Sequence, residues 1–163
     1  MQIQSFREMY LKEMQEAHSV ETQLIDVFPR MKELASNDGL KQAIAKHLDE
    51  TQSQLELLDI ILKQHGADPD QHTDQSMSTL IDESEKWVQM LDDATLRDAG
   101  LIASAQKIEH YQIAAYGTLA CWAEHLGLEE DLETLLGILK QDRTFDESLS
   151  ELAKRDVNSN AVQ

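Results

Sequence analysis

The sequence is poor in cysteine, proline and glycine, and each shortage narrows the possible folds. With one cysteine, Cys121, the chain cannot form an internal disulfide. Cys121 stands in the apolar run Leu-Ala-Cys-Trp, so we expect a buried thiol rather than a nucleophile. Two prolines and six glycines among 163 residues disfavour a turn-rich β fold and suit long helices. No stretch approaches about 18 consecutive apolar residues, so we predict no segment that spans a membrane.

Basic residues are also scarce, and this shortage argues against several kinds of partner. The chain has 14 Lys and Arg against 31 Asp and Glu, a formal net charge of −17. Because Lys and Arg carry most of the affinity for phosphates, neither nucleic acid nor an anionic membrane is an expected partner. A negative surface instead raises the local concentration of cations, which is compatible with metal uptake. The first residues lack a basic segment followed by an apolar one, so we expect no secretory signal and a cytoplasmic location.

The sequence does contain regular helical periodicity, enough for one domain. An apolar content of 41% over 163 residues is sufficient for a single core. The periodicity predicts a short amphipathic helix over about residues 77–91 and four long helices over about 3–35, 40–64, 95–127 and 129–154. We assign residues 1–155 to a helical bundle and residues 156–163 to a flexible C-terminal tail.

The lengths of the loops predict how these helices are connected. Tight turns join the first long helix to the second and the third to the fourth, which predicts two antiparallel hairpins. The link between the second and third long helices is long enough to cross the bundle from end to end. We therefore predict an all-α fold, a ferritin-like four-helix bundle whose long crossover carries the short fifth helix.

Each long helix also places an acidic residue within a mostly apolar stripe. The four acidic residues, in chain order, are Glu21, Glu50, Glu109 and Asp142. Burying an unpaired carboxylate costs several kcal/mol, so a chain that does this in every helix must compensate the charges. Carboxylates that converge inside a bundle are commonly compensated by a bound cation.

The usual two-metal pattern is nevertheless incomplete. Carboxylate-bridged sites in bundles take one Glu from each of two helices and a Glu-x-x-His pair from each of the other two. Ser53 stands three residues after Glu50, and Thr144 three residues after Gln141, where histidines would be required. His47, three residues before Glu50, lies on the same helix face. One occupied metal position, or partial occupancy, is therefore better supported than a complete di-iron pair.

Two interpretations of these residues remain open. In the first they bind iron or another divalent metal, the ligands being Glu21, Glu50 and Glu109, with His47, Asp142 and Gln141 as contributors. Redox chemistry at such a site would be Fe(II) oxidation or peroxide consumption. In the second, a metal-free network of buried hydrogen bonds with some protonated carboxyls is formed by Glu21, Glu50, Gln54, Glu109, His47 and Tyr116. His110 points about 100° around the helix from Glu109, so neither interpretation includes it.

Three segments of the chain resemble one known family. They are His-Leu-Asp-Glu-Thr-Gln-Ser-Gln at residues 47–54, Val-Glu-Thr-Gln-Leu at 20–24, and the run from Ala105 to Leu119 around Glu109. They closely resemble the YciF/YciE family of bacterial stress proteins, and the resemblance extends over roughly residues 5–155. It implies a ferritin-like bundle, a homodimer, a bacterial cytoplasm and a link to general stress, but no defined reaction.

The sequence departs from that family at positions close to the expected site. The family usually has paired glutamates where Gln141 and Asp142 stand, and a glutamate in place of Gln112. These departures argue against a two-metal oxidase. We therefore expect a stress-associated protein that binds a divalent metal through core carboxylates. The alternative is a non-catalytic stress-response dimer with a metal-free polar core.

Overall fold

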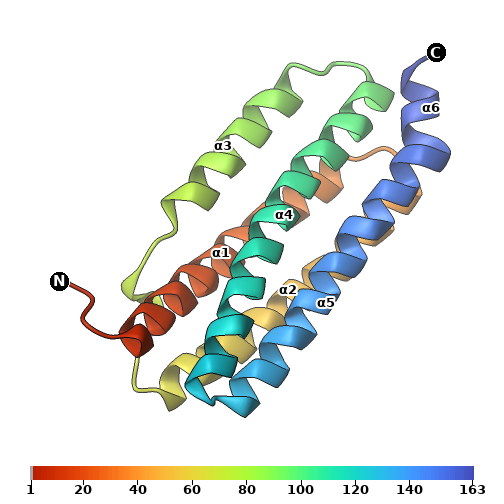
Figure 1. The fold of residues 1–163 in the computed structure, drawn as a ribbon. Helices are drawn as coiled ribbons and strands as arrows, with labels where there is room; N and C mark the ends of the chain where they lie inside the picture. Colours follow the sequence, from red (N-terminus) through yellow and green to blue (C-terminus); the bar gives the residue numbers. More distant parts are fainter. Residues whose placement is uncertain (1) are drawn as a thin grey trace.

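Four long helices form the body of the molecule, described here from a computed structural model that covers residues 2–163. They are α1 (Phe6–Leu34), α2 (Asp38–Gln64), α4 (Ala94–Leu126) and α5 (Glu129–Leu152). Between α2 and α4 lie a 3-10 turn, η1 (Pro69–Gln71), and a shorter helix, α3 (Gln75–Gln89). After α5 come a π-helical turn, η2 (Ala153–Val157), and the short helix α6 (Asn158–Ala161). Figure 1 shows α3 lying outside the bundle, alongside α4 and α1.

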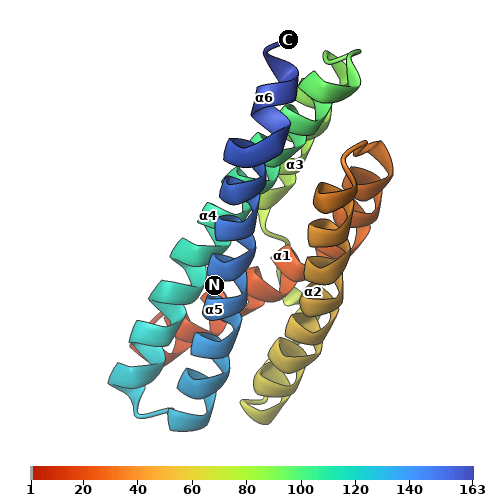
Figure 2. The same ribbon diagram turned by 90° about the vertical axis from the view of Figure 1, so that its right-hand side faces the viewer.

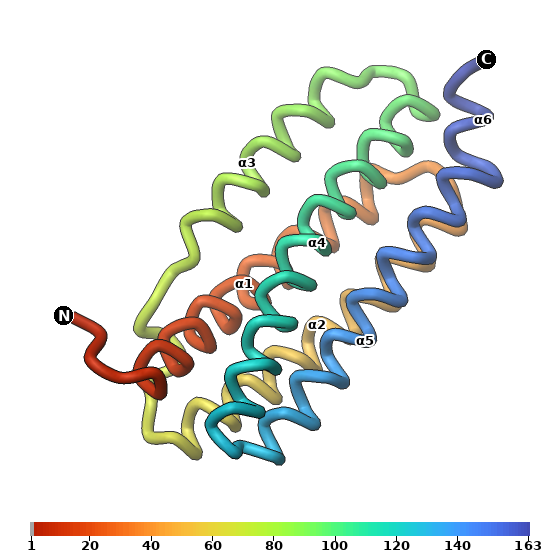
Figure 3. Tube along the Cα trace, viewed as in Figure 1, coloured from red at the N-terminus to blue at the C-terminus, as the bar shows by residue number. Residues whose placement is uncertain are grey.

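The connections match the topology predicted from loop lengths. Helices α1 and α2 form one antiparallel hairpin, and α4 and α5 form the other (Figure 2). The crossover then carries the chain back along the bundle through α3, so that α2 and α4 run in the same direction (Figure 3). The predicted all-α, ferritin-like four-helix bundle with a helix in its long crossover is confirmed.

Capping side chains fix where the helices begin. The side chains that accept a hydrogen bond from a backbone N–H in the first turn of α1, α2, α3 and α4 are Ser5, Asn37, Asp74 and Asp93. At its other end α4 stops at Gly127, whose φ of 69° lies in the left-handed region that favours glycine. These caps explain why α1 begins at Phe6 rather than near residue 3, and why α3 precedes its predicted range by two residues.

Two apolar clusters fill the core, one in each half of the bundle. One half is centred on Leu24, Phe28, Leu40, Ile44, Ile108 and Phe145, and the other on Tyr10, Met14, Leu58, Leu62, Tyr116 and Leu135. On α2, α4 and α5 the residues of the two clusters are separated by one or more turns with buried polar side chains, and on α1 Glu21 lies where the clusters meet. The four helices therefore share a polar layer across the middle of the core.

Two details differ from expectation or add to it. Cys121 is exposed, so the expected buried thiol is wrong; Leu119 and Ala120, two of the apolar neighbours that suggested burial, are buried, while Cys121 faces outward. Residues 153–161 are helical, with Val157 buried, so the segment assigned to a tail has regular structure; its flexibility stays a prediction.

Within residues 2–163, no helix is both long enough and apolar enough to cross a membrane.

Asp74 anchors the crossover against the bundle. Its carboxylate caps α3 by accepting from the Met77 N–H at 2.6 Å, and it accepts from the Tyr111 hydroxyl of α4 at 2.6 Å. Its backbone N–H donates to Ser19 Oγ of α1 at 2.9 Å, and its carbonyl accepts from Gln23 Nε2 at 3.0 Å. One buried residue therefore ties the start of α3 to two helices of the bundle.

We expect Asp74→Ala to lower the free energy of unfolding by about 2–4 kcal/mol, because it removes a helix cap and leaves a tyrosine hydroxyl without its charged acceptor. Urea denaturation measures the change. Asp70→Ala, in the same crossover but exposed, is the matched control and should shift stability by less than about 0.5 kcal/mol. Equal losses in both variants would contradict the anchoring role.

Candidate metal centre

The polar layer consists of six side chains contributed by all four long helices. They are at most 1% exposed and comprise Glu21 on α1, His47 and Gln54 on α2, Glu109 and Gln112 on α4, and Asp142 on α5. Each follows from local sequence, because the helical repeat places these positions on the same face as the core residues of its helix.

Three of these residues converge from three different helices. Ligand atoms of His47, Glu109 and Asp142 all lie within 4.8 Å of one another. His47 Nε2 and Glu109 Oε1 are 3.2 Å apart, although they are not aligned as a hydrogen bond. An imidazole nitrogen and carboxylate oxygens in such proximity form a donor set suited to a divalent metal.

The imidazole of His47 is held rigidly in this position. Its Nδ1 donates to Glu50 Oε2 at 3.0 Å, one helical turn along α2. Its ring stacks on Phe145 with centroids 4.0 Å apart and planes at 13°, and the edge of Phe28 packs at 5.3 Å. With Nδ1 bonded to Glu50, Nε2 is the ring nitrogen that faces Glu109, and it offers a lone pair to a metal once it has released its proton. Histidines that bind metals are commonly oriented by a carboxylate in this way.

Glu21 is bound on one oxygen only. Its Oε1 accepts from the Tyr116 hydroxyl and from Gln112 Nε2, the latter at 2.8 Å. Its Oε2 is buried and has no hydrogen-bond partner. One oxygen of the carboxylate is therefore held by side chains of α4, and the other is free to bind a ligand.

Asp142 shows the same arrangement with a different amide. Its Oδ1 accepts from Gln54 Nε2 at 3.2 Å, while Oδ2 has no partner. The same Gln54 nitrogen donates to Gln141 Oε1 at 2.9 Å. In this orientation the Gln54 amide nitrogen donates to two oxygen acceptors, one of which belongs to a carboxyl group.

The unsatisfied polar atoms of the core all belong to this layer. Within residues 2–163, the buried side-chain atoms without a hydrogen-bond partner are Glu21 Oε2, His47 Nε2, Gln54 Oε1, both carboxylate oxygens of Glu109, Gln112 Oε1 and Asp142 Oδ2. Leaving such atoms unpaired costs about 1–3 kcal/mol each, and more when they are charged. Their concentration in one layer indicates that something other than the protein's own donors compensates them.

Burial controls the protonation of the layer. It raises the pKa of Glu21 to about 7, since an ionised carboxylate loses its hydration there. It also raises the pKa of Glu109, and it raises that of Asp142 with further repulsion from Glu109. At His47 burial disfavours the charged ring, but the carboxylates of Glu109 and Glu50 outweigh burial and raise its pKa to about 10. Protons therefore supply the positive charge that the metal-free layer requires.

The structure assembles most of the predicted site but separates two members from its centre. Glu21, His47, Glu109 and Asp142 lie in the layer as the sequence suggested. The side chain of Glu50 is 20% exposed and lies on the outer side of His47, 3.7 Å from Lys46 Nζ. The carbonyl oxygen of Gln141 at the edge of the layer accepts from Gln54.

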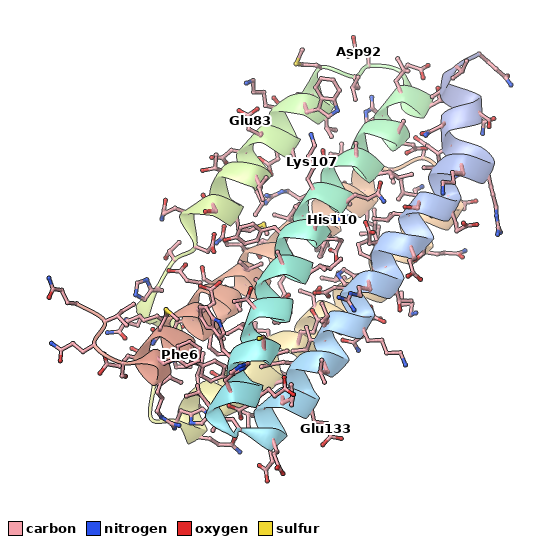
Figure 4. All side chains as sticks on the ribbon, viewed as in Figure 1. Phe6, Glu83, Asp92, Lys107, His110 and Glu133 are labelled. Atoms are coloured by element: carbon pink, nitrogen blue, oxygen red, sulfur yellow. The ribbon has the colours of Figure 1, made fainter. Side chains whose placement is uncertain are left out.

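Gln54 was expected in a buried hydrogen-bond network, but the partners of Gln54 and of Gln112 were not predicted. Gln112 lies three residues after Glu109 and Gln54 seven residues after His47, so helical spacing indicated their face but not their partners. The side chain of His110 is 67% exposed and its Nε2 lies 3.2 Å from Asp146 Oδ2, so His110 lies outside the polar layer (Figure 4). His18 on α1 is also buried, but it does not belong to the group of converging residues.

These features together define the class of protein. Two antiparallel helix hairpins, joined by a long crossover and sharing a buried layer of carboxylates and one imidazole, form a ferritin-like bundle.

The comparisons with known proteins assign the family. The family model described as "Domain of unknown function (DUF892)" matches residues 5–162, and the chain belongs to this family. It is 33% identical over 162 residues to Protein YciF of Escherichia coli K12, covering 99% of this chain and 98% of that protein. The resemblance to the YciF/YciE family is thereby confirmed.

Solved structures agree with this assignment. The crystal structure of the E. coli stress protein YciF is 32% identical, with a TM-score of 0.90, and the match covers 96% of this chain and 99% of that one. The structure of YcfI from Rhodopseudomonas palustris is 34% identical, with a TM-score of 0.88, over 91% of this chain and 94% of that one. A protein from Xanthomonas campestris, 22% identical with a TM-score of 0.76, covers 96% of both chains and shares the fold.

The raised pKa of Glu21 leads to a prediction for the metal-free protein. The pKa rises from 4.5 to about 7 on folding, so the stability that its proton provides is complete below pH 4.5 and is lost as the pH rises through 7. The Glu21→Gln side chain keeps an oxygen that can accept hydrogen bonds from Tyr116 and Gln112, but the amide cannot ionise. We expect the variant to be more stable than the wild type at about pH 8, by on the order of 2 kcal/mol, and not at about pH 4.

Chemical denaturation across this pH range, with a chelator present, measures the difference. Glu33→Gln, on the exposed face of the same helix, is the control and should leave the pH profile unchanged. A gain for Glu21→Gln that is equal at both ends of the range would show that ionisation of Glu21 does not drive it.

Proposed function

We propose that this protein binds a divalent metal ion, with iron as the redox-active candidate, in the polar layer at the centre of its bundle. The observation that carries the proposal is the set of unpartnered buried atoms, all of which lie in this layer among the described residues. The donor chemistry supports it, because imidazole nitrogen and carboxylate oxygen suit Fe2+ and Mn2+.

Different residues have different roles in this proposal. His47, Glu109 and Asp142, which already converge, are the proposed ligands, and Glu21 contributes through its free Oε2. Glu50 acts through His47 by holding the Nδ1 proton and thereby presenting Nε2 to the metal. Gln141 does not contact the metal in this proposal. It accepts a hydrogen bond from the Gln54 amide, which also donates to Asp142.

Iron in such a site would donate electrons to oxygen or peroxide. The chain's own residues would orient the metal, exclude bulk water from the fully buried layer, and hold a proton on the Tyr116 hydroxyl, whose pKa burial raises well above its usual range. The formal net charge of −17 would draw cations toward the protein. Glu50, at the partly exposed edge of the site, is the proposed point of first contact.

The biological setting proposed here comes from the relatives. The solved E. coli homologue is described as a stress protein, and we propose a stress-associated role for this chain as well. The family resemblance also supports a homodimer in the bacterial cytoplasm.

A metal-free structural role is the second candidate. The hydrogen bonds from Gln54, Gln112 and Tyr116 already satisfy part of the layer, and the raised pKa values favour neutral carboxyls. YcfI of R. palustris, a solved relative, is described as a candidate structural protein. In this case the layer would specify how the helices align rather than bind an ion.

Metal analysis separates the two functions. After anaerobic incubation with Fe2+ and desalting, mass spectrometry should find stoichiometric metal in the wild type and almost none in Glu109→Gln, because this substitution removes a charged ligand from the centre. Glu124→Gln, exposed on the same helix, is the matched control and should bind as the wild type does. Absence of metal from the wild type would favour the metal-free structural role.

The role of Glu50 gives a separate prediction. If it orients His47 rather than binding the metal, Glu50→Gln should retain the site but weaken metal affinity by about 10–100-fold, as loss of such outer partners does. Titration calorimetry with Mn2+ measures the affinity. Glu56→Gln, exposed on the same helix, should leave it unchanged, whereas complete loss of binding in Glu50→Gln would make Glu50 a direct ligand.

A further inference from the structure

The hydrogen bonds of the polar layer restrict how many cations it can hold. Two-metal sites place their ions about 3.5–4 Å apart and depend on carboxylates that bridge them, with one oxygen on each ion. A bridging carboxylate must therefore keep a lone pair available for an ion on each of its two oxygens. Three carboxylates lie in this layer, Glu21, Glu109 and Asp142.

Glu21 does not meet that requirement. The Tyr116 hydroxyl and Gln112 Nε2 both donate to its Oε1, and all three side chains are at most 1% exposed. Two donors on a single oxygen leave only Oε2 for a metal. Releasing Oε1 would leave a buried hydroxyl and a buried amide N–H unpaired, at a cost of about 1–3 kcal/mol each.

Asp142 is restricted less completely, by one donor from the opposite hairpin, so its Oδ1 could bind an ion only alongside that hydrogen bond. Gln54 Nε2 donates to Oδ1 at 3.2 Å and is itself fixed by its bond to Gln141 Oε1 at 2.9 Å. Only Oδ2 remains free. Glu109 alone among the three has both oxygens without partners.

We infer that the amides of Gln54 and Gln112 limit the site to a single divalent cation, by holding Asp142 and Glu21 as ligands through one oxygen each. The inference rests on the proposed function, since it concerns the number of ions in the same site. Each amide also leaves its own carbonyl oxygen buried and unpartnered, so the layer contains two neutral oxygen atoms besides the carboxylates. Such oxygens suit hard cations like Mn2+ and Fe2+.

The number of Mn2+ ions bound per chain tests this inference. The intact wild-type protein, saturated with Mn2+ and desalted, should contain one ion by mass spectrometry. Its electron paramagnetic resonance spectrum should show the hyperfine structure of an isolated ion, without the exchange coupling of a bridged pair. The variant Gln54→Glu/Gln112→Glu removes both restricting amides and adds two carboxylates, so it should bind two ions and show that coupling.

A control of equal charge is available on the outer surface. Gln52→Glu/Gln64→Glu, at exposed positions of α2, should bind one ion as the wild type does. Two coupled ions in the wild type would overturn the inference while leaving metal binding intact. One ion in the amide-replaced variant, if folded, would also overturn it. No ion in the wild type would instead overturn the proposed function itself. The wild-type count and spectrum remain decisive if the double variant does not fold.

Discussion

The burial of charged and polar groups in one layer of the core is the constraint on which the rest of this structure depends. The layer divides the apolar interior into two clusters, and every long helix contributes to both clusters and to the layer between them. A shift of any helix by one turn would place carboxylates against apolar side chains, at a cost of several kcal/mol. The layer therefore sets the register of the bundle as well as its chemistry.

The same constraint explains why the layer is only partly satisfied. Tyr116 and the amides of Gln54 and Gln112 provide donors to Glu21 and Asp142, whereas Glu109 faces an imidazole with which it is not aligned for a hydrogen bond. In the absence of another cation, protons retained by the raised pKa values balance the charge. Protons and a metal ion are thus alternative ways to compensate the negative charge of the layer, because a metal binds only to deprotonated ligands.

Replacement of carboxylates by amides changes such a layer in two ways. Each replacement removes a negative charge, and each introduces an N–H that occupies an oxygen of a remaining carboxylate. The layer keeps a converging imidazole and carboxylates while losing the freedom of two of them to bridge. Membership of the DUF892 family and likeness to YciF establish the fold, and the amides of Gln54 and Gln112 determine which carboxylate oxygens of the layer remain unpartnered.

The sequence by itself determined the helices, their hairpin order, the crossover and most residues of the layer, because helical periodicity and loop length are local properties. It placed Glu21, His47, Glu109 and Asp142 on core faces correctly. Only the tertiary structure decided that Glu50 lies outside His47 and that Gln54 and Gln112 each bind one oxygen of a carboxylate on another helix. Which atoms meet depends on the rotation and height of neighbouring helices, and that information is carried by packing across the whole core rather than by spacing along one helix.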